Sequence, residues 1–490
     1  MHLRNPYRTP LDFQALAEFY PLLTPLLNYI LWIQDIISSV EGKIRGLDIG
    51  TGASAIYPLL ACSLPDNLHW SFVATEIDPL SIEYATRNIN TNGLTSRITL
   101  FPVSADSGSI LVPFFADLES GFDFTICNPP FYGSAEEIKR SAENKELPPN
   151  AVCTGAENEM ITHGGEAEFV LRILRESLRD DIKNRCRWFT SMLGKLSSVE
   201  VVVSELRNLK IDNYALTQFV QGTTRRWAIA WSFGDERLPD KYARPISTSL
   251  VPFIPLPTTL RQRVTLDTNQ IKIFLSQILS SINGLSFAFS DGNGSGSESE
   301  TGTQPDDVHV QWSGTITAFE NTWSRAARRR SKKRVHAQLE VNEDCPEDKN
   351  RNTEQVAASK KKRPVQSMDP EHSGHVSQEQ GHVRCDILRE AHPVPILDKD
   401  LNPKLYPSTA PSPSTSIVSK KEELRPILVC RIDAGILEPT TDSQPRYKIG
   451  KELRGPESTF LVAQWMRGAD RAVFEGFWSH VCRKLKSFEE

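Results

Sequence analysis

The sequence predicts an α/β protein whose central sheet is mostly parallel and closes with an antiparallel hairpin. Three observations predict this class. From Gly42 to Gly234, short apolar runs alternate with helical patterns, and such alternation builds a parallel sheet with helices on both faces. Two β-rich runs then flank "QGTTR" (221–225), which predicts the hairpin. A Gly/Ser-rich stretch over 290–304 predicts a flexible linker to a smaller α+β region.

The elements of the first region follow from short local patterns. "RGLDIG" (45–50) is β-rich and ends in glycine, which predicts a strand that runs into a tight turn. Pro79 suits the first turn of a helix, and Gly93 suits its end. The further predicted strands are 70–78, 97–104, 122–128, 187–193, 214–220 and 226–233. The predicted helices are 53–64, 79–94, 164–179 and 197–209.

The second region is predicted to be a small α+β domain that is split by a long insertion. β-rich runs follow the linker and recur at 425–435 and 459–468, and an amphipathic pattern over 470–486 predicts a helix. Residues from about 341 to 421 are rich in charge, Ser and Pro, which favours disorder. The predicted division is an N-terminal arm and helix (1–41), an α/β domain (42–288), a linker (289–305) and a C-terminal domain (306–490).

Composition excludes several classes of protein. The chain has 490 residues and a formal net charge of -5, so any nucleic-acid-binding surface must be a local basic patch. The eight cysteines form no C-x-x-C pair, which argues against a zinc ribbon and suits a reducing compartment. Pro, Asn, Gln and Asp interrupt the most apolar early stretch, 20–37, so it predicts a core helix rather than a membrane span. We expect a soluble intracellular protein without a metal site.

"LDIGTGAS" (47–54) places an acidic residue at a strand end and a glycine-rich turn before a helix. Gly50 and Gly52 let the backbone approach a ligand closely. Ala55 stands where a dinucleotide-binding turn would have its third glycine. The carboxylate of Asp48 would repel a pyrophosphate, but it could hold an ammonium group through a charge-assisted hydrogen bond. The pattern therefore favours a methionine-like group over a phosphate.

"ATEIDP" (74–79) ends the next predicted strand with Glu76, where doubly wound folds place an acid on ribose hydroxyls. The alternative for Glu76 alone is a solvated strand end. Taken together, the Asp48 turn and Glu76 indicate S-adenosylmethionine as the cofactor.

"CNPPF" (127–131) ends another strand of the same sheet, so we expect it at the same edge. The prolines remove two backbone donors and fix the shape of the segment. The Asn128 side chain and the Pro129 carbonyl can then accept both hydrogens of a planar amino group, and Phe131 or Tyr132 can stack on a base or an amide. The alternative is a Pro-Pro turn that only connects a strand to a helix.

Six stretches together resemble the methyltransferase-like protein 16 family: "LDIGTGASAIYPLL", "ATEIDPLSIEYATRNI", "CNPPFYGS", "TGAENEMITHGGEAEFVLRIL", "RWFTSMLGK" and "QGTTRRWAIAWSFG". The resemblance covers roughly 28–234. It implies a Rossmann-like class I methyltransferase fold that uses S-adenosylmethionine to form N6-methyladenosine in structured RNA, with U6 small nuclear RNA as the expected substrate. "NPP" followed by an aromatic residue is also found in DNA-adenine and protein-glutamine methyltransferases.

The resemblance also implies roles for individual residues. The expected cofactor-binding residues are Asp48, Gly50, Thr51, Gly52, Ser54, Glu76 and Asn128. The expected catalytic residues, which would hold the target adenine, are Asn128, Pro129, Pro130 and Phe131. The expected RNA-binding residues of the α/β domain are Lys195, Arg225 and Arg226, with solvated surface as the alternative for each of them.

Two parts of the chain depart from the family pattern or match it less specifically. Family members usually have a longer basic segment before the "LNYI" helix, with Arg ahead of that helix and His within it, where this chain has Leu26 and Leu31. We expect this departure to weaken RNA binding. In the C-terminal region, "RAARRRSKKR" (325–334) is a basic patch that predicts RNA contacts by Arg328, Arg329 and Arg330, with a nuclear-import signal or a solvated tail as alternatives.

Three functions remain to be distinguished by the structure. The first is an RNA adenine-N6 methyltransferase of the nucleus, with the cytoplasm as a second location. The second is a protein-glutamine methyltransferase, although such enzymes usually have Tyr where this chain has Phe131. The third is an RNA-binding scaffold without catalysis.

Overall fold

A computed structural model describes ten segments of the chain: 23–104, 108–111, 121–132, 134, 162–222, 224–291, 308–327, 329–330, 425–437 and 459–489. The N-terminal arm before residue 23, most of the expected linker, the whole insertion at 341–421 and Arg328 lie outside the described residues. The helices are α2 (Leu23–Ile36), α3 (Ile56–Ser63), α4 (Pro79–Thr91), α8 (Gly165–Ser177), α9 (Asp180–Lys183), α10 (Leu196–Asn208), α11 (Asp240–Ala243), α12 (Thr268–Ser280) and α14 (Arg471–Lys486), with 3-10 turns η1 (Pro65–Asn67) and η3 (Thr248–Leu250).

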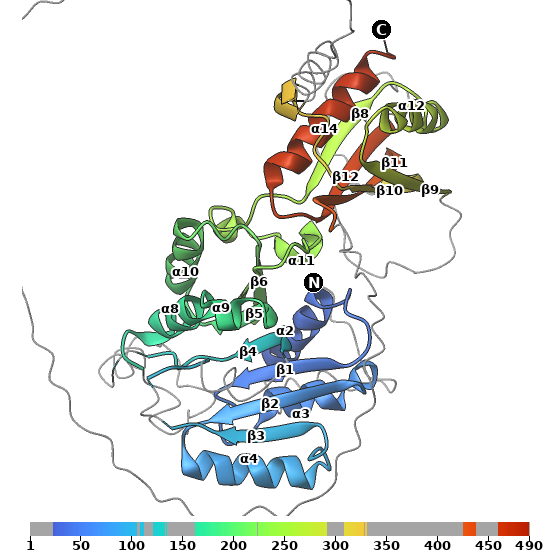
Figure 1. The fold of residues 1–490 in the computed structure, drawn as a ribbon. Helices are drawn as coiled ribbons and strands as arrows, with labels where there is room; N and C mark the ends of the chain where they lie inside the picture. The colour runs from blue at the N-terminus through green and yellow to red at the C-terminus, as the bar shows by residue number, and fades with distance from the viewer. Residues whose placement is uncertain are drawn as a thin grey trace, which may run out of the picture. The chain divides into compact units, whose positions relative to one another are not determined.

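The first sheet has seven strands in the order β3-β2-β1-β4-β5-β7-β6 (Figure 1). Strands β1 to β5 pair in parallel, whereas β7 pairs antiparallel with both β5 and β6. The predicted α/β class with a closing antiparallel hairpin is therefore confirmed. The strands are β1 (Ile44–Ile49), β2 (Trp70–Glu76), β3 (Ile98–Pro102), β4 (Phe122–Cys127), β5 (Cys186–Leu193), β6 (Tyr214–Gln221) and β7 (Thr224–Trp231).

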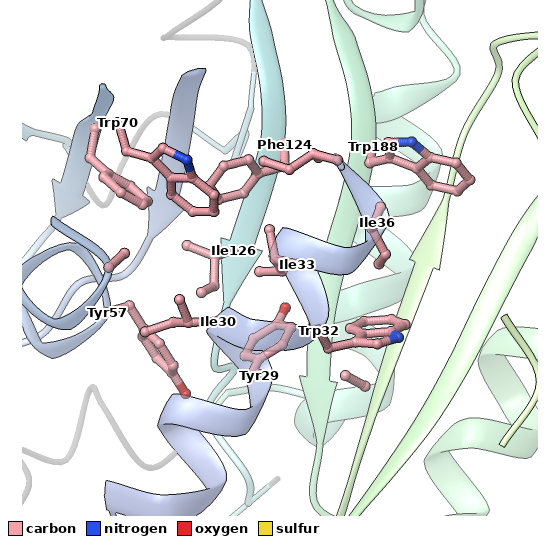
Figure 2. Packing of buried hydrophobic residues seen from close by; sticks show 14 of the residues in the cluster. Tyr29, Ile30, Trp32, Ile33, Ile36, Tyr57, Trp70, Phe124, Ile126 and Trp188 are labelled. Atoms are coloured by element: carbon pink, nitrogen blue, oxygen red, sulfur yellow. The ribbon is translucent and has the colours of Figure 1, made fainter. Parts of the chain in front are cut away.

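Helices cover both faces of this sheet because side chains alternate along each strand. One face packs against α2, α3 and α4, and the other packs against α8 and α10. Helix α2 buries Tyr29, Ile30, Ile33 and Ile36 at about helical spacing, and Figure 2 shows them together with residues of β4 and β5. Full burial of such an apolar side chain contributes about 1.5–3 kcal/mol. As the sequence predicts, α2 is a core helix, and it covers the strand that leads to Asn128.

The second sheet has five antiparallel strands in the order β8-β12-β11-β10-β9. Its core is a hydrophobic cluster of its own, which includes buried residues of α12 and α14 such as Leu275 and Phe477. Its strands are β8 (Thr259–Val264), β9 (Leu285–Asp291), β10 (Val308–Ala318), β11 (Leu428–Leu437) and β12 (Thr459–Arg467).

The predicted domain boundary at residue 288 is wrong. It falls inside β9, and β8 and α12 also belong to the second sheet and its core. The Gly/Ser-rich composition after residue 290 marks a connection between two strands of one sheet rather than a boundary between domains. Sequence patterns could not reveal this, because β8 pairs with β12, where Val264 lies opposite the distant Thr459.

Among the described residues, no helix is long and apolar enough to cross a membrane. Within the same ranges, His, Cys, Asp and Glu side chains form no group of three or more that could hold a metal ion.

Candidate active site

A glycine-rich turn follows β1 at the carboxyl edge of the first sheet. Gly50 and Gly52 have φ of 69° and 64°, in the left-handed region that glycine adopts at little cost. The Gly50 N–H donates to Thr75 Oγ1 at 3.2 Å, and the Thr51 N–H donates to the Thr75 carbonyl at 2.8 Å. A Cβ on Gly50 would meet no atom of the described residues within 4 Å. The turn is therefore held rigidly against β2, with open space beside Gly50.

Glu76 at the end of β2 is buried and fixes the turn. Its Oε2 accepts the Gly52 N–H at 2.8 Å, and its Oε1 accepts the N–H groups of Ile77 and Asp78 at 2.8 and 3.0 Å. A carboxylate has about four acceptor positions, so one position on Oε2 remains for a ligand hydroxyl. Glu76 is therefore no solvated strand end, and the expected ribose contact stays a prediction.

Asp48 lies in β1, one residue before the strand ends, and its side chain is fully buried. Neither carboxylate oxygen has a hydrogen-bond partner of good geometry among the described residues, and the same is true of the Thr51 hydroxyl. Burial raises the pKa of Asp48 to about 7, the charge of Glu76 adds to this, and the nearby Thr51 hydroxyl opposes it. A buried acceptor without a donor needs a ligand donor, and an ammonium group would restore the ionised carboxylate.

Asn128 lies at the same edge because β1 and β4 are parallel neighbours. Ile49 pairs with Cys127, so the residues that follow both strands, Gly50 and Asn128, leave the sheet side by side. The Asn128 Oδ1 is buried and has no partner among the described residues, and Pro129 beside it is buried as well. As predicted, the sheet brings the glycine turn and "CNPPF" together, and "CNPPF" presents an acceptor that no donor of the described residues satisfies.

Phe131 is half-buried and contacts residues of β7 and of the turn after β5. The Arg226 guanidinium of β7 lies over its ring, with Cζ 5.2 Å from the ring centroid. Gly194, which follows β5, approaches the ring so closely that a Cβ there would lie 2.9 Å from Phe131 Cδ1. Lys195 Nζ lies 5.9 Å from the centroid of the neighbouring Tyr132. The structure thus brings Lys195 and Arg226 to the "NPPF" segment.

The other predicted contact residues have plainer surroundings. Arg225 and Ser54 are exposed; the Arg225 carbonyl accepts a hydrogen bond from Arg226, and the Ser54 carbonyl accepts one from Asn88 of α4. Arg329 and Arg330 are exposed residues of a short helical segment after β10, and they do not belong to the first sheet. Their predicted contacts with RNA stay predictions.

Glu166 is a site residue that sequence reasoning missed. It lies in the first turn of α8, and its buried carboxylate accepts the Gly194 N–H at 2.7 Å and the Lys195 N–H at 2.9 Å. Glu166 thereby fixes the turn that contacts Phe131. The available signal was an acidic residue in a helix whose buried face is mostly apolar, because a buried acid is rare unless it is paired.

The residues present fit S-adenosylmethionine. The carboxylate of Asp48, which has no donor among the described residues, matches the ammonium group of the cofactor's methionine part. The open space beside Gly50 leaves room for that methionine part, and Glu76 retains one acceptor position for the ribose. When bound, this cofactor supplies an electrophilic methyl group on a sulfonium. S-adenosylmethionine is the cofactor for this site.

Comparison with known proteins places this site in a family. A family model described as RNA methyltransferase matches residues 20–235. The U6 small nuclear RNA (adenine-(43)-N(6))-methyltransferase of Schizosaccharomyces pombe is 37% identical over 336 residues, which cover 66% of this chain and 78% of that protein. The RNA N(6)-adenosine-methyltransferase mettl16 of Danio rerio is 31% identical over 353 residues, 69% of this chain and 70% of that protein.

Among solved structures, the hMettl16 catalytic domain in complex with MAT2A 3′UTR hairpin 1 is 40% identical. The match covers 46% of this chain and 73% of that chain, with a TM-score of 0.40. The sequence relatives carry the assignment by themselves, because each is more than 30% identical and is covered over more than two thirds of its length. The chain belongs to the METTL16 family of RNA N6-adenosine methyltransferases.

Proposed function

We propose that this chain transfers the methyl group of S-adenosylmethionine to N6 of an adenosine in structured RNA, and that U6 small nuclear RNA is its substrate. The observation that carries this proposal is the unsatisfied buried Oδ1 of Asn128, which leaves the sheet beside the glycine turn. The amino group of adenine is planar and has two hydrogens to donate. The Asn128 oxygen and the Pro129 carbonyl form a pair of acceptors for these two hydrogens.

The chemistry follows from that arrangement. An exocyclic amine is a poor nucleophile because its lone pair is delocalised into the ring. Two acceptors favour a more tetrahedral nitrogen, whose lone pair can point at the sulfonium methyl group. The N–C bond then forms as the S–C bond breaks, and S-adenosylhomocysteine leaves. The methylated nitrogen is acidic and gives its extra proton to water, so positioning supplies most of the rate enhancement and no strong base is needed.

Phe131 and its neighbours supply the binding of the base. Its ring offers a stacking surface for adenine, and stacking on an aromatic side chain contributes about 1–3 kcal/mol for each base. Arg226 and Lys195 place two cations next to this ring and that of Tyr132, where they suit the phosphates that flank an extruded nucleotide. This cationic surround favours RNA over a glutamine side chain as the substrate.

The C-terminal region and the location of the protein belong to the same proposal. Arg328, Arg329 and Arg330 would add phosphate contacts to structured RNA, and U6 as a substrate implies a nuclear protein. The Schizosaccharomyces pombe relative, whose name specifies U6 small nuclear RNA, supports this choice of substrate.

The test uses the full chain, labelled S-adenosylmethionine and total small nuclear RNA. After digestion to nucleosides, label is expected in N6-methyladenosine and concentrated in U6. Label concentrated in another RNA would show that U6 is not the substrate. Label in glutamine of added protein extract would show that the chain methylates protein instead of RNA. Binding of S-adenosylmethionine without any transfer to RNA or protein would favour the non-catalytic scaffold.

A further inference from the structure

Tyr29 on α2 is a buried tyrosine whose hydroxyl contacts the strands next to the site. Its side chain has no exposed surface, and its hydroxyl oxygen lies 2.7 Å from Thr190 Oγ1 on β5. Figure 2 shows the Tyr29 ring between Ile30 and Trp32, close to Tyr57 of α3. The rings of Tyr29 and Tyr57 meet edge to face, with their centroids 5.8 Å apart. This packing fixes the ring, so the hydroxyl is held in one place.

The direction of the hydrogen bond between Tyr29 and Thr190 follows from its neighbour. Thr190 Oγ1 donates its single hydrogen to the carbonyl oxygen of Thr125 on β4 at 2.6 Å. Thr190 can therefore only accept from Tyr29, which must donate. Burial raises the pKa of Tyr29 well above its ordinary value, so this hydroxyl keeps its proton. A chain of two hydrogen bonds thus runs from α2 through β5 to β4.

Thr125 and Thr190 lie just beyond the last residues of β4 and β5 that pair in the regular register, and hydrogen bonds of their side chains join the two strands there. The backbone register pairs Phe122 with Cys186 and Phe124 with Trp188. Immediately beyond, the Thr190 N–H donates to the side-chain oxygen Thr125 Oγ1 at 2.9 Å. On the side of β5, the end of β4 is therefore held by side-chain hydrogen bonds, whereas on its other side it pairs with β1 as far as Cys127. Asn128 follows Thr125 by three residues.

We propose that Tyr29 is a positioning residue for methyl transfer. Through Thr190 it holds the Thr125 carbonyl and, with it, the end of β4 from which Asn128 projects. The inference rests on the proposed function of Asn128 as the acceptor for the adenine amino group. A tyrosine with a purely structural role would contribute to stability, but its loss would leave the geometry of Asn128 and the rate of transfer unchanged.

The experiment compares Tyr29→Phe with Tyr214→Phe in the full chain. Tyr214 is a buried tyrosine of β6 whose hydroxyl donates to the Phe253 carbonyl at 3.0 Å, so the same atom is lost away from β4. Tyr29→Phe is expected to lower kcat roughly tenfold or more, because a small displacement of a positioning group is costly. We expect KM for RNA and the Kd for S-adenosylmethionine to stay within about twofold. Tyr214→Phe is expected to lower Tm to a similar extent without changing kcat.

Two variants of Thr190 test the route of the effect. Thr190→Val removes the hydroxyl, and its combination with Tyr29→Phe should be no slower than the slower single variant, because both act through one bond. Thr190→Ser keeps the hydroxyl and should retain most of kcat. A readout without turnover is amide hydrogen exchange over 122–128, which should become faster in Tyr29→Phe and stay unchanged in Tyr214→Phe.

The outcomes separate this inference from the proposed function. An active wild type with equally active Tyr29→Phe, or with equal losses in both Tyr→Phe variants, would overturn the positioning role and leave the methyl transfer standing. An additive double variant would overturn the route through Thr190. A wild type that forms no N6-methyladenosine in any RNA would remove the proposed function, and the inference would fall with it.

Discussion

Both sheets of the protein bury apolar cores, yet they differ in which buried polar atoms they leave without a hydrogen-bond partner. Among the described residues, the buried oxygens without a hydrogen-bond partner all come from the first sheet and α3: Asp48 Oδ1, Asp48 Oδ2, Thr51 Oγ1, Tyr57 Oη and Asn128 Oδ1. In the described part of the second sheet and its helices, the only buried side-chain N or O atom without a partner is an indole nitrogen, Trp323 Nε1. A buried oxygen without a donor costs free energy, commonly about 1–3 kcal/mol.

The two regions therefore differ in whether their buried polar groups contribute to stability or remain available to a ligand. Apart from Trp323 Nε1, the buried side-chain N and O atoms in the described part of the second region have hydrogen-bond partners, as expected for a part whose role is to fold and present a surface. The first region tolerates unsatisfied acceptors where two neighbouring strands end, and a ligand with donors can satisfy them. Substitutions in the first region should therefore affect activity more than stability, and substitutions in the core of the second region should do the reverse.

The largest effect is expected for Asn128→Ala at the edge of the first sheet. Loss of the side-chain acceptor should lower methyl transfer by roughly a thousandfold or more, because the amine then has no partner that favours a reactive nitrogen. Tm should change little, since no donor among the described residues loses a partner, and S-adenosylmethionine binding should weaken far less than the rate falls. Single-turnover methylation and isothermal titration check both parts. Full activity in this variant would rule out the amine-acceptor role.

Ile432→Ala in the second sheet is expected to show the reverse pattern, a loss of stability without a loss of cofactor binding. Ile432 is fully buried in the core formed with α12 and α14, so its truncation should cost about 2–5 kcal/mol of unfolding free energy. The affinity for S-adenosylmethionine should remain at the wild-type value. Denaturant unfolding, followed together with cofactor binding, measures both quantities. A loss of cofactor affinity at temperatures where the variant is folded would contradict the separation of the two regions.

Asp48→Asn is expected to weaken the binding of S-adenosylmethionine and to make the folded protein more stable at pH 8. The variant should weaken S-adenosylmethionine binding by roughly 10- to 150-fold, the equivalent of a charge-assisted hydrogen bond. The raised pKa of Asp48 means that the folded protein without ligand binds a proton more tightly than the unfolded chain does. The wild type therefore loses stability as the pH rises from about 4 to about 7, and Asp48→Asn, which cannot ionise, should be more stable than the wild type at pH 8.

The pH dependence of binding provides the control for Asp48. Wild-type affinity should increase between pH 6 and 7.5, as the Asp48 carboxylate ionises near its pKa of about 7. Asp48→Asn should lose this dependence. Titrations at several pH values distinguish the two, and an unchanged slope in the variant would assign the pH dependence to another group.

The sequence could predict those parts of the site that depend on strand ends. The carboxyl ends of parallel strands meet at one edge, so the positions of Asp48, Glu76 and Asn128 in their strands were enough to bring them together. Glu166 and Tyr29 could not be found in this way. Tyr29 contacts Thr190 across 161 residues, and Glu166 contacts Gly194 across 28, so their roles follow from how helices pack on the sheet rather than from a local pattern.

The same reasoning explains the misplaced domain boundary. The Gly/Ser-rich stretch is the most conspicuous break in composition, but composition reports only which residues resist ordering. Strand β8 has an alternating pattern of partly exposed side chains, with Arg261 and Arg263 pointing to the exposed face, so its apolar content is low. Its membership of the second sheet is decided by pairing with β12, which no window of sequence contains.

Gly194→Ala is expected to have the smallest effect, and it tests how closely the site is packed. A Cβ at Gly194 would lie 2.9 Å from Phe131 Cδ1 and 3.1 Å from Glu166 Oε2, so the aromatic ring must shift. We expect kcat/KM for RNA to fall roughly tenfold, with unchanged S-adenosylmethionine affinity, because the displaced ring stacks less well on the base. The control is Gly234→Ala, where the nearest atom to an added Cβ is Ser232 Oγ at 3.3 Å and no aromatic ring is involved. Equal activity of the two variants would mean that the position of Phe131 does not limit transfer. The edge of the first sheet that contains the buried acceptors would then tolerate a displaced aromatic ring without loss of function.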